Sequence, residues 1–369
     1  MEPLRSAEAL FRPYVLNGLD LANRVVMAPM TRSMSPGGIP GPDVAAYYRR
    51  RAASDVGLIL TEGTTIDHPV SSGDPAVPNF FGDSLPGWKH VVDEVHDAGG
   101  RIFPQLWHVG VMRRAGPGHR NAETPSASPS GLAKPGKRVG EPMTPEDVRA
   151  AIEAFASGAR EARRLGFDGV EIHGAHGYLV DQFFWEALNE RDDGFGGDLA
   201  GRTQFAVEIV RAVRREVGSD YPVAFRYSQW KQQDYAARLA RTPEELGRFL
   251  KPLVEAGVDA FHCSQRRFWE PEFEGSPLNL AGWTKRLSGK TAITVGSVGL
   301  SGEFIASFAG ESSQSAPLDQ LLDRLEADEF DLVAVGRALL VDPEWASKIR
   351  AGRSAELRSF TKEALATLS

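Results

Sequence analysis

Residues 168–183 read DGVEIHGAHGYLVDQF, and the first six of them form a short run around Val170 and Ile172 that ends in His173. A run of this length and composition is typical of a strand that is covered on both faces, as in a parallel sheet. Two further polar residues, His176 and Tyr178, follow within five positions. The stretch therefore predicts a buried parallel strand whose carboxyl end carries two imidazoles and a phenol.

Seven further runs of the same kind lie at 25–29, 57–62, 101–106, 222–226, 259–263, 291–296 and 331–336. Amphipathic segments separate most of them and predict helices near 42–55, 86–98, 145–165, 199–217, 243–256 and 343–351. An open doubly wound sheet can show the same alternation. Eight strands with polar residues at their carboxyl ends favour instead a closed α/β barrel, the (β/α)8 TIM fold.

Two segments add to this pattern. Asn17-Gly18, inside 13–26, is a hairpin signal, so we expect an N-terminal hairpin that could plug the bottom of the barrel. The segment 109–143, after the third strand, is a long loop rich in Gly, Pro, Ser and Arg. It is either a lid or binding loop or a mobile surface loop, and both interpretations stay open. We interpret residues 1–369 as a single domain.

Composition excludes several classes of function. The 369 residues carry a net charge of −7 without a long basic block, which argues against nucleic acid as a partner. Cys263 is the only cysteine, so neither an internal disulfide nor a cysteine-bound cluster can form. The chain shows neither the pattern of a signal peptide nor that of a membrane span. We expect a cytoplasmic protein, monomer or homodimer, that acts on a small molecule.

Polar or glycine residues recur at the predicted strand ends, which meet at one mouth of a barrel. They are Thr31, Glu62, Gln105, His173, Arg226, Gly296 and Gly336-Arg337. The turns after the seventh and eighth strands, 296–299 and 336–337, place glycines where backbone can approach a ligand closely. Barrels commonly bind a phosphate there, and Arg337 would add a charge-assisted contact. The pattern predicts a phosphate-containing ligand.

The motif His173-Gly-Ala-His176-Gly-Tyr178 allows three interpretations. Two histidines could bind a metal, although no third ligand stands at a clear spacing beyond the nearby Glu171. They could also form a structural pair. Thirdly, the two imidazoles could grip one substrate oxygen while the tyrosine hydroxyl supplies a proton.

Six stretches in the same order resemble the Old Yellow Enzyme family of FMN-dependent ene-reductases, over roughly residues 10–352. They are 23–32, 61–64, 105–108, 169–173 with 177–183, 189–197 with Arg202, and Gly336-Arg337. The chain departs from the commoner pattern in continuing strand five into 225–235. It also has His176 where Asn is frequent, and Thr31 where one branch has Cys. These departures leave FMN binding as implied and bear on the substrate.

The resemblance implies non-covalent FMN as cofactor and NAD(P)H as hydride donor. Pro29, Met30 and Thr31 would face the flavin ring. Gly63 and Gln105 would contact its pyrimidine edge, with Arg226 near N1, where a positive group stabilises charge on the reduced ring. The FMN phosphate would be held by four residues, Gly296, Ser297, Gly336 and Arg337. No metal is expected.

The resemblance also implies a ping-pong reduction of activated C=C bonds in α,β-unsaturated carbonyl or nitro compounds. His173 and His176 would bind the substrate oxygen, Tyr178 would donate the proton, and Trp107 would line the substrate side. One alternative is a flavoenzyme acting mainly on nitro compounds, nitrate esters or quinones. A more distant one is a flavin-free barrel lyase of a phosphorylated substrate. Lys231 and Lys285 are its possible Schiff-base residues, although neither clearly ends a predicted strand.

Overall fold

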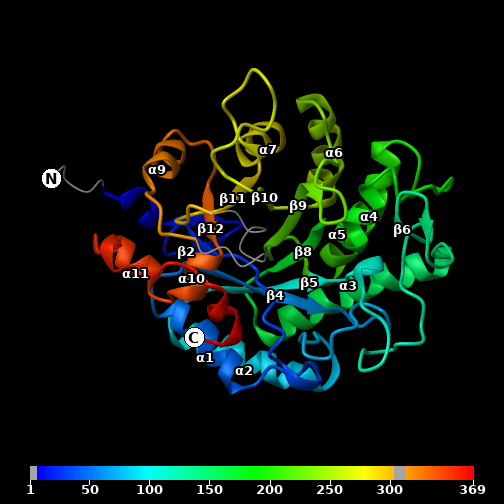
Figure 1. Cartoon of the computed structure of the whole chain (residues 1–369), viewed down its shortest axis with the longest axis horizontal. Coiled ribbons are helices and arrows are strands. Elements are labelled where there is room, and N and C mark those ends of the chain that lie inside the picture. The colour runs from blue at the N-terminus through cyan, green and yellow to red at the C-terminus, as the bar shows by residue number, and fades with distance from the viewer. Residues whose placement is uncertain (1–5, 303–312) are drawn as a thin grey trace.

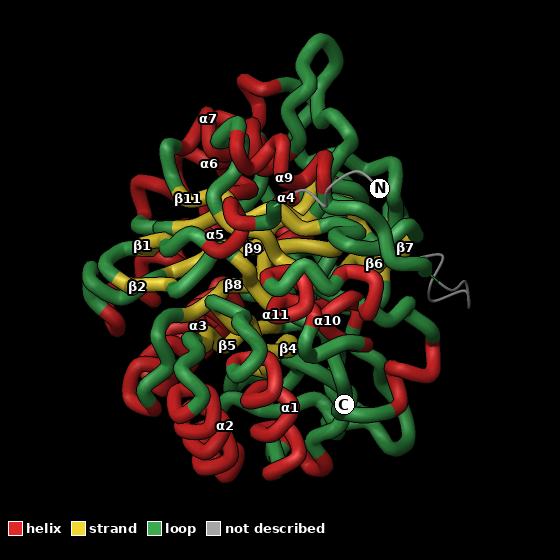
Figure 2. The backbone as a smooth tube through the Cα atoms, turned by 90° about the vertical axis from the view of Figure 1, so that its left-hand side faces the viewer, coloured by secondary structure: helices red, strands yellow, loops and turns green. Residues whose placement is uncertain are grey.

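The computed structural model describes residues 6–302 and 313–369. Eight parallel strands close into a barrel in the order β10-β11-β12-β3-β4-β5-β8-β9. Their bounds are β3 (Val25–Met27), β4 (Leu58–Thr65), β5 (Ile102–Trp107), β8 (Val170–His176), β9 (Val223–Lys231), β10 (Ala260–Ser264), β11 (Thr291–Val295) and β12 (Leu332–Val335). Each overlaps a predicted apolar run, so the predicted TIM barrel is confirmed. Figures 1 and 2 show the strands in the interior, with the helices packed around them.

Helices occupy the predicted places: α1 (Pro42–Ala52), α2 (Leu85–Asp97), α3 (Pro145–Leu165), α5 (Leu199–Val217), α6 (Pro243–Ala256) and α11 (Trp345–Arg350). Among residues 6–302 and 313–369, the sequence did not predict four further helices: α4 (Leu179–Phe184), α7 (Leu280–Ser288), α9 (Asp319–Glu326) and α10 (Arg337–Val341). Cap chemistry fixes the ends of α3, where the Thr144 side chain accepts from the amide of Asp147 and Gly166 closes the helix at a φ of 90°. No described helix has both the length and the hydropathy to cross a membrane.

The predicted N-terminal hairpin is present as β1 (Tyr14–Leu16) and β2 (Leu19–Leu21), which pair antiparallel around Asn17-Gly18. Leu16 and Leu21 are buried and belong to the small apolar cluster that fills the barrel. Among the barrel residues of that cluster are Val26, Leu58, Leu60, Phe103, Ala224, Ala260, Ile293 and Leu332. The hairpin therefore plugs the barrel, as expected.

The long loop after β5 carries a single 3-10 turn, Gly110–Met112, and the short antiparallel pair β6 (Leu132–Lys134) and β7 (Lys137–Arg138). Leu132 packs with Trp185 and Leu188, next to α4. None of the residues 109–143 lines the cavity at the barrel mouth described below. The start of the loop, Val109 and Met112, packs with Trp107 and Tyr178, but the loop does not line the cavity as a lid would.

Register brings the chemistry-bearing residues together on neighbouring strands. Gln105 lies opposite Glu171, and His173 lies opposite Arg226. Arg226 in turn lies opposite His262 of β10. A parallel ladder thus joins residues that are far apart in the sequence.

Candidate active site

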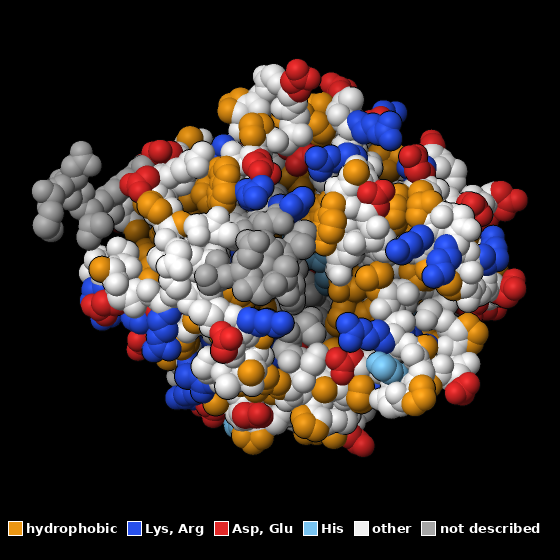
Figure 3. Space-filling model, in the orientation of Figure 1, with side chains coloured by type: hydrophobic (Ala, Val, Ile, Leu, Met, Phe, Trp, Pro, Cys, Tyr) orange, Lys and Arg blue, Asp and Glu red, His pale blue; other side chains and the backbone are white. Residues whose placement is uncertain are grey.

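A cavity of about 450 Å³ lies at the carboxyl ends of the barrel strands, within the size range of cofactor sites. It is lined by every residue predicted to bind cofactor or substrate except Gly63: Pro29, Met30, Thr31, Gln105, Trp107, His173, His176, Tyr178, Arg226, Gly296, Ser297, Gly336 and Arg337. Figure 3 shows a hollow near the middle of one face, with Lys and Arg side chains around it. The strand-end residues therefore converge as a barrel requires.

Gly63, predicted to contact the flavin, and Glu62, predicted among the strand-end residues at the mouth, do not line this cavity. The Glu62 carboxylate instead accepts the backbone amides of Arg32 and Ser33. A Cβ at Gly63 would lie 2.6 Å from Cε3 of Trp107, which is closer than real contacts allow. The missing side chain lets the Trp107 indole lie against β4. In this structure Gly63 thus gives Trp107 room to reach the cavity.

A tight turn at the end of β8 presents the two histidines and the tyrosine. His176 has a φ of 66° and Gly177 a φ of 78°, a left-handed pair that allows α4 to start immediately afterwards. A Cβ on Gly177 would lie 1.8 Å from Oε1 of Gln233. Strained backbone of this kind is common at functional sites.

The three rings form one cluster between two indoles. The His173 ring centroid lies 5.1 Å from those of His176 and Tyr178. Trp107 stacks on His173 at 6.2 Å, and Trp230 stacks on His176 at 4.8 Å. The indoles fix the ring planes, so the polar atoms of the cluster keep one orientation toward the cavity.

Burial sets the protonation states of this cluster. It lowers the pKa of His173 and of His176 well below the ordinary value, and the Arg226 charge lowers both further. Burial also raises the pKa of the Tyr178 phenol. At neutral pH the site therefore holds two neutral imidazoles and a protonated phenol.

Glu171, which lies in β8 two residues before His173, organises a buried network that the sequence did not reveal. Nε2 of Gln105 donates to Oε1 of Glu171 over 2.7 Å, and Nδ1 of His262 lies 2.7 Å from Oε2. Glu171 and His262 have no exposed surface. The carboxylate thus holds the Gln105 amide by its nitrogen, so the orientation of this amide at the cavity wall is fixed.

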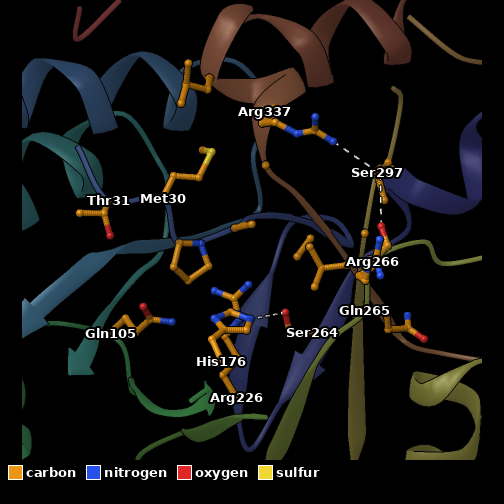
Figure 4. Close-up of a pocket in the computed structure, with 18 of the residues that line it drawn as sticks. Met30, Thr31, Gln105, His176, Arg226, Ser264, Gln265, Arg266, Ser297 and Arg337 are labelled. Carbon is orange, nitrogen blue, oxygen red and sulfur yellow. Dashed lines mark hydrogen bonds between the residues drawn. The ribbon is translucent and has the colours of Figure 1, made fainter. Parts of the chain in front are cut away.

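At the opposite end of the cavity, Ser297 and Arg337 meet (Figure 4). Nη2 of Arg337 lies 3.5 Å from Oγ of Ser297 and donates to the carbonyl of Gly302 over 2.6 Å. Gly296 has a φ of 140°, and a Cβ there would lie 2.8 Å from the carbonyl of Gln265. Close backbone approach and a guanidinium are what a phosphate group requires.

The cavity wall is strongly positive. Among residues 6–302 and 313–369, four arginines line it, Arg32, Arg226, Arg266 and Arg337, and no Asp or Glu does. Nε of Arg226 is buried without a hydrogen-bond partner. An anionic ligand with a phosphate at the Arg337 end fits this wall, whereas a cationic ligand does not.

The other two interpretations of the histidine motif find less support. Within residues 6–302 and 313–369, no three His, Cys, Asp or Glu side chains are grouped so that they could hold a metal ion. The expectation that Lys231 does not end a strand was wrong, since Lys231 is the last residue of β9. It is buried and paired with Asp181, while Lys285 lies in α7 and pairs with Asp328 and Asp331. In the part of the chain that the structure describes, no lysine lines the cavity.

Residues 9–356 match the model of the NADH:flavin oxidoreductase / NADH oxidase family, whose members use FMN. The chain belongs to this family. It is an FMN-dependent oxidoreductase of the Old Yellow Enzyme type, as the sequence motifs predicted. The cavity fits the cofactor, because the guanidinium of Arg337 beside Ser297 suits a phosphate at one end and Arg226 lies at the far wall.

Relatives in the family are reductases and oxidases. The chain is 33% identical over 349 residues to the putative 12-oxophytodienoate reductase 2 of Oryza sativa subsp. japonica, covering 93% of this chain and 87% of the rice protein. It is 33% identical over 360 residues to NADH oxidase of Thermoanaerobacter brockii, covering 95% of this chain and 52% of the oxidase.

The solved structures that resemble this chain also include a reductase. Morphinone reductase superposes with a TM-score of 0.80 at 26% identity, covering 96% of this chain and 92% of that protein. Its complex with tetrahydroNAD superposes with a TM-score of 0.79. A nicotinamide cofactor analogue therefore binds a barrel of this shape, which supports NAD(P)H as the hydride donor for this oxidoreductase.

Proposed function

We propose that this oxidoreductase reduces the activated C=C bond of α,β-unsaturated carbonyl or nitro compounds in a ping-pong cycle. The observation that carries the proposal is the cluster of His173, His176 and Tyr178 on one wall of the cofactor cavity. Two neutral imidazoles beside a protonated phenol suit a substrate that needs an oxygen held and a carbon protonated. Relatives named as 12-oxophytodienoate reductase and morphinone reductase are consistent with such substrates.

FMN, when bound, supplies the hydride that it has taken from NAD(P)H. Pro29, Met30 and Thr31 would lie against its ring, with Gln105 and Arg226 at the pyrimidine edge. Gly296, Ser297, Gly336 and Arg337 would hold its phosphate. Gly63 would act there indirectly, through the position of Trp107. A positive Arg226 favours added electron density nearby, which makes hydride acceptance from NAD(P)H easier.

The histidine wall would hold the electron-withdrawing group of the substrate. A carbonyl or nitro oxygen between the imidazoles accepts a hydrogen bond from the N–H group of each. These hydrogen bonds strengthen as negative charge develops on the oxygen in a water-poor site. The C=C bond is thereby polarised so that its β carbon becomes electrophilic. Tyr178 lies next to His173 and would give its phenolic proton to the α carbon, while Trp107 excludes water from the same face.

The oxidative half-reaction tests this proposal. Enzyme reduced anaerobically with NADPH or NADH is mixed in a stopped-flow instrument with 2-cyclohexenone, a nitroalkene, a nitrate ester and a quinone. We expect the enone and the nitroalkene to reoxidise the enzyme with saturation, giving the saturated ketone and the nitroalkane. Reoxidation by the quinone or the nitrate ester alone, with no alkene reduced, would refute the proposal in favour of the alternative flavoenzyme.

The proposal also covers the number of domains, the cellular location and the oligomeric state. We infer that residues 1–369 form one domain, that the protein is cytoplasmic and that it is a monomer or a homodimer. The family match over 9–356 and the shared barrel support a single domain. Light scattering of the purified protein determines the oligomeric state.

A further inference from the structure

The two histidines of the site have different hydrogen-bond environments. Nδ1 of His173 accepts the backbone amide of Ala175 over 3.3 Å. A neutral imidazole carries one proton, so the proton of His173 lies on Nε2. Nε2 has no partner among the described residues, yet it is not sealed in the core. The N–H of His173 therefore faces the cavity.

His176 is bound the other way round. Its Nε2 lies 2.6 Å from the hydroxyl oxygen of Ser264, at the end of β10 (Figure 4). Its Nδ1 has no hydrogen-bond partner within residues 6–302 and 313–369 and is likewise not sealed. The atom of His176 that a ligand in the cavity can reach is therefore Nδ1, the opposite nitrogen from that of His173.

Ser264 is itself held in place. Its carbonyl oxygen accepts Nε1 of Trp230 over 3.2 Å, and the Trp230 ring stacks on His176. Ser264 is 4% exposed. Its hydroxyl has no other hydrogen-bond partner among the described residues, so the contact with Nε2 is the one that orients it.

We propose that Ser264 is a positioning residue that donates its hydroxyl proton to Nε2 of His176 and so keeps the His176 proton on Nδ1. The proposal rests on the proposed function, in which the substrate oxygen needs a second N–H donor. With the opposite tautomer, Nδ1 would turn a lone pair toward that oxygen and would repel it. A serine hydroxyl can donate or accept, so it permits the required tautomer where a pure acceptor would forbid it.

The tautomer can be measured without any reaction. The protein is labelled with ¹⁵N-histidine, and long-range ¹H–¹⁵N correlation separates the protonated from the unprotonated ring nitrogen. The signals of His176 are assigned by their loss in His176→Asn. We expect Nδ1 to be protonated in wild type and the proton to shift toward Nε2 in Ser264→Ala. A wild-type ring protonated on Nε2 would overturn the proposal, whatever the enzyme reduces.

Ligand binding gives the second readout. Phenols bound over the flavin are titrated by their long-wavelength charge-transfer band. Loss of one neutral hydrogen bond predicts roughly three- to tenfold weaker binding to Ser264→Ala. Ser264→Thr keeps a hydroxyl and should restore both the affinity and the Nδ1 proton. Equal weakening in both variants would show a packing effect only and would refute the role of the hydroxyl.

These outcomes separate the two proposals. If wild type shows the Nδ1 proton but reduces no enone, the proposed function fails and the tautomer assignment stands. If enones are reduced and Ser264→Ala changes neither the tautomer nor the phenol affinity, the positioning role fails and the proposed function stands.

Discussion

Nζ of Lys231 lies 2.5 Å from Oδ1 of Asp181, and both side chains are almost fully buried. The second oxygen of Asp181 accepts the backbone amide of Gly177 over 2.7 Å. The ion pair therefore ties the end of β9 to the turn that presents His176 and Tyr178. Breaking a buried pair leaves an uncompensated charge, which costs more than the pair contributes.

Replacing Lys231 by Met should lower the free energy of unfolding by roughly 3–5 kcal/mol, because the Asp181 carboxylate would stay buried without its partner. Denaturant unfolding measures this loss. Lys285→Met is the matched control, since Lys285 pairs with Asp328 and Asp331 in a more exposed position and should cost about 1 kcal/mol or less. Similar losses in both variants would contradict the role assigned to the buried pair.

Tyr178→Phe should slow alkene reduction by roughly 10²- to 10⁴-fold, the usual contribution of a positioned proton donor. Reduction of the enzyme by NAD(P)H should keep its rate, because no carbon is protonated in that half-reaction. Stopped-flow absorbance at the flavin band follows each half separately. A slower reductive half-reaction with normal alkene reduction would remove Tyr178 from its proposed role.

Arg337→Met should weaken FMN binding by roughly 10- to 100-fold, the loss expected for a hydrogen bond to a charged group. Riboflavin, which lacks the phosphate, serves as the matched ligand, and its affinity should be unchanged. Fluorescence quenching of each flavin by apoprotein gives both dissociation constants. An equal loss for the two flavins would place Arg337 elsewhere than at the phosphate.

Much of the site could be predicted because the residues at the carboxyl ends of the strands are the ones that meet at the mouth of a barrel. His173 and Arg226 each end a predicted strand, and such strands can be recognised in the sequence without knowing which strands pair. Glu171 and His262 could not be paired in this way, because they are 91 residues apart and meet only through the register of β8, β9 and β10. Strand order around the barrel would have been the needed signal.

The end of β9 shows the same limit. The predicted apolar run ends at 226, yet β9 continues to Lys231, and residues 228–231 are all buried in the strand. Their burial is possible because partners from other segments satisfy them, such as Asp181 for Lys231. The helix α4 was missed since its six residues, 179–184, are all buried and show no amphipathic period.

The oxidative half-reaction with an enone should be nearly independent of pH between 6 and 9. Burial holds the pKa of His173 and His176 well below the ordinary value and raises that of Tyr178, so none of them titrates in this window. Reduced enzyme and 2-cyclohexenone are mixed at each pH. An inflection near pH 6.5 that is lost in His176→Asn would show that an imidazolium is the working form.

Glu62 should make the stability of the folded protein depend on pH, unlike the oxidative half-reaction. Burial raises the pKa of its carboxyl to about 7, although Oε2 accepts the amides of Arg32 and Ser33. The folded state thus binds a proton more tightly than the unfolded chain, so this contribution to stability is present below pH 4.5 and is lost as the pH rises toward 7. Glu62→Gln keeps an acceptor for the two amides and removes the titration.

The Tm difference between Glu62→Gln and wild type should therefore rise in favour of the variant from pH 5 to pH 8. The slope corresponds to at most about 1.4 kcal/mol per pH unit, the limit for one proton. Glu190→Gln, at an exposed carboxyl that pairs loosely with Arg138, should show no such trend. A constant difference across the range would mean that Glu62 is already ionised in the folded protein at pH 5, with Arg32 close enough to hold the charge.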